Sequence, residues 1–179
     1  MATVKISDNV GTFQGADPSY LGVYLAAVHD IPATVAAQRF LSLFNPSGSG
    51  RVLVVLGVTV QDYSVNSVTA STSMEVWRAS AASAGTLQAA ANVNRFLTTF
   101  PNPSAEVRTA NPTVTLSGTD ALVGFAPSLG SGAQSPNAAS PTPGASFVIL
   151  PGQGVVFVQN AGDVDERWNV QIIWAEKNL

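Results

Sequence analysis

The feature that most limits the fold of this chain is a series of short runs rich in β-branched residues, separated by Gly, Pro and Asn. Runs of this kind predict the strands of an all-β sandwich or barrel, because β-branched side chains pack well on a pleated sheet and the separating residues favour turns. The clearest run is Arg51–Val60, which follows the turn-forming segment Asn45–Gly50 and is apolar on both faces in its first half. That pattern predicts a central or interface strand.

Alternation of apolar and polar residues predicts the next strands. In Arg167–Trp174, Trp168, Val170, Ile172 and Trp174 share one face, which indicates a half-buried strand that closes a sheet. We expect Ser73–Ala79 to be the partner of the strand at 51–60. The remaining predicted strands are Ala37–Phe44, Thr113–Leu116, Ser146–Leu150 and Val155–Val158, of which the last two flank a tight Pro-Gly turn.

Three segments break this pattern. Ala79–Ala91 consists of small residues and is interpreted as a loop that could hold one helical turn, since Gly85 disfavours a long helix. Leu129–Gly144 is a long Ala/Ser/Pro-rich loop, too polar to bury. Residues 1–22 have weak periodicity and are predicted to form an N-terminal arm, with Ala2–Tyr20 as a docking segment, ahead of a single domain at 23–179.

Composition narrows the class of function. Hydrophobic residues make up 46% of the chain and charged residues only 11%, so most polar residues on the surface must be uncharged. A surface of this kind suits lasting contact between proteins. The net charge of -3 and the scattered basic residues argue against nucleic acid as a partner. The start of the chain lacks the pattern of a secretory signal, and the longest apolar stretch, Val52–Val60, is far too short for a bilayer, so no membrane partner is expected.

The inventory of reactive residues is thin. The chain has no Cys and one His, and we predict no catalytic residue, metal ligand or cofactor, and hence no enzyme. His29 and Asp30 are interpreted as a turn before Pro32. Asn160–Glu166 could hold calcium, but it lacks the spacing of an EF-hand loop, so we interpret it as an acidic turn. Ser47–Arg51 is interpreted as a turn and not as a phosphate-binding loop, because no Lys-Ser/Thr pair follows it.

Aromatic residues are the best candidates for an interface, since their large side chains are enriched where proteins meet. The chain has three Trp, three Tyr and eight Phe. Trp77 is the clearest candidate because its face of the predicted strand also carries Glu75. The predicted interface residues are Phe13, Tyr20, Tyr24 and Trp77.

A resemblance to a known family extends over roughly residues 35 to 179. It rests mainly on two blocks of sequence, Asn45-Pro-Ser-Gly-Ser-Gly-Arg51 and Leu150-Pro-Gly-Gln-Gly154. With the strands around them, they resemble the small jelly-roll virion proteins of tailed bacteriophages. The resemblance implies an antiparallel jelly-roll β-sandwich and a capsid decoration (cement) protein, made in the host cytoplasm. It further implies a trimer on the virion surface, bound to the major capsid protein.

Two alternatives remain open. A receptor- or glycan-binding component of a head or tail fibre is suggested by the aromatic residues and the low charge. Leu-Pro-Gly turns also occur in cupin enzymes, but those need a cluster of metal-binding His residues, which a chain with one His cannot supply.

Overall fold

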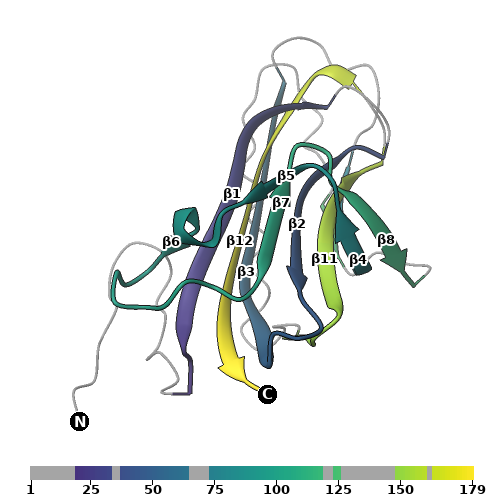
Figure 1. Ribbon diagram of the computed structural model, residues 1–179. Coiled ribbons are helices and arrows are strands. Elements are labelled where there is room, and N and C mark those ends of the chain that lie inside the picture. Colours follow the sequence, from purple (N-terminus) through teal and green to yellow (C-terminus); the bar gives the residue numbers. More distant parts are fainter. Residues whose placement is uncertain (1–18, 34–36, 65–72, 119–122, 126–147, 161–162) are drawn as a thin grey trace.

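The computed structural model describes residues 19–33, 37–64, 73–118, 123–125, 148–160 and 163–179. In these parts the chain is almost entirely β-strand, and the strands form two antiparallel sheets packed against each other (Figure 1). The prediction of an all-β sandwich is therefore confirmed. The predicted loop at Leu129–Gly144, Phe13 and nearly all of the docking segment lie outside the described residues.

Sheet A is built around the C-terminal strand. Its order is β10 (Val148–Ile149), β3 (Arg51–Ser64), β12 (Asp163–Asn178), β1 (Gly22–Ala33) and β6 (Asn94–Arg95). The predicted alternation in β12 is confirmed, because Trp168, Val170, Ile172 and Trp174 are all 1% exposed or less. The expectation that this strand closes a sheet is wrong: β12 lies in the middle, paired with β3 on one side and β1 on the other.

Sheet B contains the other strands. Its order is β5 (Thr86–Gln88), β7 (Glu106–Thr109), β2 (Arg39–Asn45), β11 (Gln153–Gln159), β4 (Met74–Ser83) and β8 (Thr113–Ser117), and β9 (Val123–Phe125) also pairs with β4. The predicted pairing of 73–79 with 51–60 is wrong, because β4 pairs with β11 in sheet B while β3 belongs to sheet A. Alternation reports which face of a strand is buried, not which strand lies beside it.

The segment Ala79–Ala91 was also predicted incorrectly. Strand β4 continues to Ser83, β5 follows at Thr86–Gln88, and only Ala90–Asn92 forms a short 3-10 helix, η1. Small side chains have weak strand propensity, but pairing with β8 and β7 holds this segment extended.

The strand pairs are nested along the chain, so that strands early in the sequence pair with strands late in the sequence. β1 pairs with β12, β2 with β11, β3 with β10, and β4 with β8 and β9. The Pro-Gly turn is confirmed, since Gln153 N donates to Leu150 O at 3.0 Å and Gly152 has φ 79°. This turn does not join paired strands, because β10 lies in sheet A and β11 in sheet B.

The main core fills the space between the two sheets. Its largest fully buried side chains include Trp168, Trp174, Tyr24, Phe40 and Phe157. These come from both sheets, so burial of this cluster holds the sandwich together.

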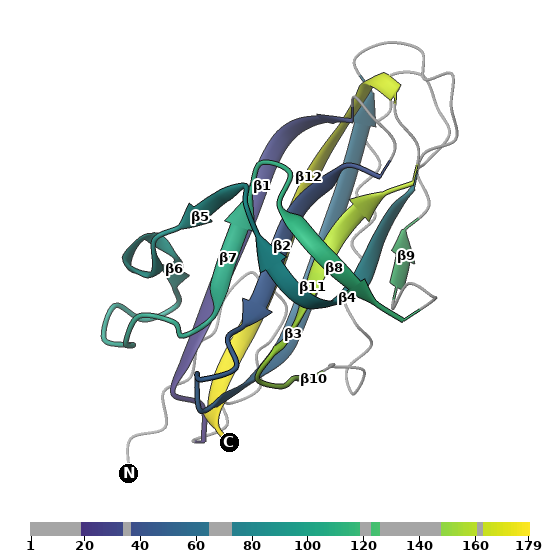
Figure 2. The ribbon, with the colours of Figure 1, turned by 45° about the vertical axis from the view of Figure 1, so that its right-hand side comes forward.

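Strands β4 and β5 together run antiparallel to β8 and β7, forming one bent two-stranded ribbon (Figure 2). The bend falls where Ala84 and Gly85 on one strand and Ala110 and Asn111 on the other have positive φ. A second cluster, the outer cluster of sheet B, packs on the face of β11 turned away from the main core. It comprises Ala79, Val114, Val156 and Val158, with Trp77 and Ala82 against it.

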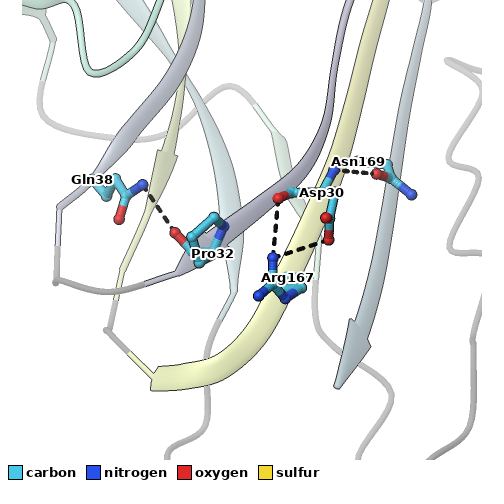
Figure 3. A network of polar contacts seen from close by, with 5 residues as sticks. All are labelled: Asp30, Pro32, Gln38, Arg167 and Asn169. Carbon is cyan, nitrogen blue, oxygen red and sulfur yellow. Dashed lines mark hydrogen bonds and ion pairs between the residues drawn. The ribbon is translucent and has the colours of Figure 1, made fainter. Parts of the chain in front are cut away.

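The predicted turn at His29 and Asp30 is instead an irregularity within β1, where the register with β12 shifts between Val28 and Ile31. Asp30 has φ 55°, and its backbone N–H donates to Asn169 Oδ1 at 2.8 Å (Figure 3). Arg167 Nη1 lies 3.1 Å from Asp30 Oδ1. A bulge of this kind redirects the strand without ending it.

Candidate interface

The outer face of sheet A carries an apolar cluster at one end. The outer cluster of sheet A comprises the buried residues Val23, Ile173 and Ala175, with the partly buried Tyr20, Leu25, Leu56, Phe96 and Phe100 packed against them. The other end of this face is polar, with Thr59 exposed and Gln61 and Gln171 half-buried. Antiparallel sheets commonly bury one face and solvate the other, so an apolar patch on the second face indicates a surface that is covered.

Tyr20, a predicted interface residue, belongs to this cluster. It is half-buried, and the Nζ of Lys177 lies 4.7 Å from the centre of its ring. An ammonium group over an aromatic face is attracted by the negative face of the ring. Tyr20 therefore joins the described end of the N-terminal region to the outer face of β12.

Phe96 and Phe100 reach the cluster on the segment that follows β6. The backbone N–H of Phe96 donates to Val23 O at 3.1 Å, which continues the pairing along β1. Arg95 Nη1 donates to Phe100 O at 3.0 Å, and the Tyr24 hydroxyl donates to Pro101 O at 3.1 Å. This segment thus lies beside β1, as Figure 1 shows on the left of the sheet.

A buried carboxylate fixes the end of the same segment. Glu176 is 2% exposed, and its oxygens accept hydrogen bonds from Ser104 N at 2.8 and 3.1 Å, from Ser104 Oγ at 3.0 Å and from Ala105 N at 3.1 Å. Glu176 was not predicted from the sequence. The alternation in the sequence did indicate that Glu176 is buried, because Glu176 shares the face of Trp174 and therefore falls on the buried side of β12.

Tyr24, another predicted interface residue, lies in the main core. Its side chain is fully buried, and its ring centroid lies 5.5 Å from that of Trp174. Burial, and secondarily the charge of Glu176, raise the pKa of Tyr24 to about 12, while Arg51 and Arg95 oppose the rise. The side chain does not reach the surface of this chain, and core packing accounts for it.

Trp77 lies on the opposite side of the molecule from Tyr20. It is half-buried against the outer cluster of sheet B, and its Nε1–H donates to Glu75 Oε2 at 2.8 Å. The alternation that placed Glu75 and Trp77 on one face is confirmed by this contact. Of the predicted interface residues that the structure describes, Tyr20, Tyr24 and Trp77 thus lie in three different places.

The two blocks that carry the resemblance meet at one end of the sandwich. Asn45 is fully buried, and its Nδ2 donates to Arg51 O at 2.9 Å and to Ile149 O at 3.1 Å. The backbone oxygen of Asn45 accepts from Gly152 N at 2.8 Å. The Ser47–Arg51 segment is a turn, as predicted, with Ser49 N donating to Pro46 O at 3.0 Å and β3 following it.

The described residues contain no group of three or more His, Cys, Asp or Glu that could hold a metal ion. His29 is exposed, and the side chains of 161–166, which include most of the calcium candidate, lie outside the description. Asn160 Oδ1 accepts from Ser73 N at 2.6 Å. In the part of the chain that is described, no helix is long and apolar enough to cross a membrane.

Comparison with known protein families, with curated proteins and with solved structures found no match to this chain.

Proposed function

We propose that this chain is a structural protein of a bacteriophage virion, a capsid decoration (cement) protein that binds the major capsid protein and stabilises the head. The observation that carries the proposal is the outer cluster of sheet A, which makes one end of this sheet apolar on both faces. In a chain with 11% charged residues, covering such a surface removes few charges from water.

Two further features support the proposal. The nested pairing of β1 to β4 with β12 back to β8 is the order that results when one long hairpin is rolled up, as in a jelly roll. Asn45 links the two blocks on which the resemblance rests, so they form one end of the sandwich. These features support the jelly-roll fold that the resemblance implies.

The fibre alternative depended on an available aromatic side chain. Trp77 is partly covered by the outer cluster of sheet B, and its only hydrogen-bond donor on the ring is directed to Glu75. A sugar would have to stack on the remaining part of this ring. We therefore propose the decoration function in preference to glycan binding.

The proposal is tested on purified virions of the phage that encodes the chain. We expect a copy number comparable to that of the major capsid protein, and particles without the chain that lose their DNA at lower temperature. Adding the purified protein back should restore the stability of these particles. A few copies per particle, or location on the tail, would overturn the decoration function.

The site of attachment can be tested in the same assay. Leu56→Lys would place a charge in the outer cluster of sheet A and should reduce binding to the stripped particles. Thr59→Lys changes an exposed residue of the same strand and face and serves as the control. Equal binding by the two variants would exclude this cluster as the attachment surface.

A further inference from the structure

Strand β8 lies at one end of sheet B in the part of the chain that the structure describes. β8 pairs with β4 on one side, and among the described residues no strand pairs with its other side. The backbone N–H and C=O groups on such an edge are available to another strand. Figure 1 shows β8 at the right-hand border of the molecule, beside β4.

Natural proteins usually protect exposed edges with charged residues, Pro or bulges. β8 has the sequence Thr-Val-Thr-Leu-Ser, with no charged residue and no Pro, and four of its five residues are exposed. Pro112 stands just before the strand, where it leaves the five N–H groups of β8 in place. As far as the described residues go, this edge is therefore open to strand addition.

Leu116 indicates what kind of strand fits. Its neighbour across the sheet is Ala79, and two positions earlier Val114 lies opposite Ala82, so Leu116 is on the same face as the outer cluster of sheet B. Val114 is buried at 6% exposure, whereas Leu116 is 37% exposed. The cluster thus extends to the edge strand and stops at a side chain that is still open to water.

We infer that β8 pairs with β8 of a second copy of this chain, antiparallel about a two-fold axis through Thr115. In that register Thr115 lies opposite Thr115 of the second copy, and each Leu116 lies opposite Val114 of the other chain. The exposed Leu116 would then be covered by an apolar neighbour, and the two outer clusters would become continuous. In a register shifted by one residue, Leu116 would lie opposite Thr115 or Thr113 of the second copy and would lose its apolar partner Val114, so the register centred on Thr115 is favoured.

The inference goes beyond the proposed function, because it concerns the protein in solution and does not require a virion. It also differs from the trimer that the resemblance implies, since a contact between two identical edges joins copies in pairs. The other edge strand of sheet B, β5, carries the exposed Leu87 and supplies a matched control.

The first experiment measures the mass of the purified chain by light scattering after size exclusion. We expect twice the 18.4 kDa of one chain. Leu116→Lys should weaken the dimer by about tenfold or more, because it places a charge opposite Val114 of the second copy. Leu87→Lys should leave the dimer unchanged. A monomeric or trimeric wild type, or equal effects of the two substitutions, would overturn the inference.

A second experiment remains informative if Leu116→Lys fails to fold. The chain has no Cys, so each single-cysteine variant reports one position only. Thr115→Cys should form a covalent dimer on mild oxidation, because directly opposed residues have Cα atoms about 4.5–5.5 Å apart, within reach of a disulfide. Thr113→Cys, on the same exposed face, would be separated from its copy by roughly 14 Å and should not cross-link. Equal cross-linking of the two variants would contradict the two-fold register.

Discussion

Removing the carboxylate of Glu176 should cost more stability than any other single change to a charged side chain in the described part of this protein. Glu176 is 2% exposed and accepts hydrogen bonds from three donors, Ser104 N, Ser104 Oγ and Ala105 N. A hydrogen bond to a charged group contributes about 1.5–3 kcal/mol, and the three together give an upper bound of roughly 4.5–9 kcal/mol. Because the freed loop can regain water, we expect Glu176→Ala to lower the free energy of unfolding by about 3–5 kcal/mol.

The assay is urea unfolding followed by tryptophan fluorescence, for which Trp174 is a near probe. Glu176→Gln keeps one accepting oxygen and should cost about 1–2 kcal/mol. Glu106→Ala is the control, since Glu106 forms a partly exposed ion pair with Arg108 at 3.1 Å and should contribute less than about 1 kcal/mol. If Glu176→Ala cost no more than this control, the carboxylate would not hold the segment at Ser104 in place, and the reasoning would be refuted.

Three further predictions concern Tyr24, the bend of the ribbon and Asn45. Since its pKa is raised to about 12 in the folded state from 10.0, Tyr24 contributes stability that is complete below pH 10 and is lost as pH rises through 12. Urea unfolding should show a loss of about 2–3 kcal/mol over this range that is absent in Tyr24→Phe. In Gly85→Ala the new Cβ would lie 2.4 Å from Thr109 O, so this variant should lower the free energy of unfolding by more than about 2 kcal/mol. Gly50 also has a positive φ but lies in open space, so Gly50→Ala should lower it by only about 1 kcal/mol, as measured by thermal unfolding. Asn45→Ala leaves two backbone carbonyls without their donor and should cost about 2–3 kcal/mol, with faster amide exchange in the neighbouring Pro-Gly turn.

The strands that sequence reasoning located correctly are those in which local pattern and packing agree. In β12, four apolar residues alternate along the strand, and each of them is buried in the main core. The same reasoning failed for the partner of β3, because β3 and β4 follow each other in sequence but lie in different sheets. Which strands pair depends on contacts between distant segments, and alternation within one strand carries no information about them.

The candidate interface was harder to predict for the same reason. Tyr20 could be proposed from its type alone, but Phe96 and Phe100 lie in a segment with no clear period. They are held there through contacts between residues far apart in sequence, such as Tyr24 with Pro101 and Glu176 with Ser104. Tyr24 was assigned to an interface because it is aromatic, whereas its position on the inner face of β1 places it beside Trp174.

The two outer clusters differ in how completely this chain covers them, and that difference favours separate roles for the two sheets. On sheet A, Tyr20, Phe96 and Phe100 already cover Val23 and Ala175, so a partner would meet a surface formed by several segments. On sheet B, the cluster ends at a single exposed side chain, Leu116, on an uncharged strand edge. A broad mixed surface suits attachment to a different protein, whereas an open edge with one unsatisfied apolar residue suits its own copy, because identical edges match each other in length and register. In the arrangement that we propose, one chain would bind its copy through β8 and the major capsid protein through sheet A, and neither contact would block the other.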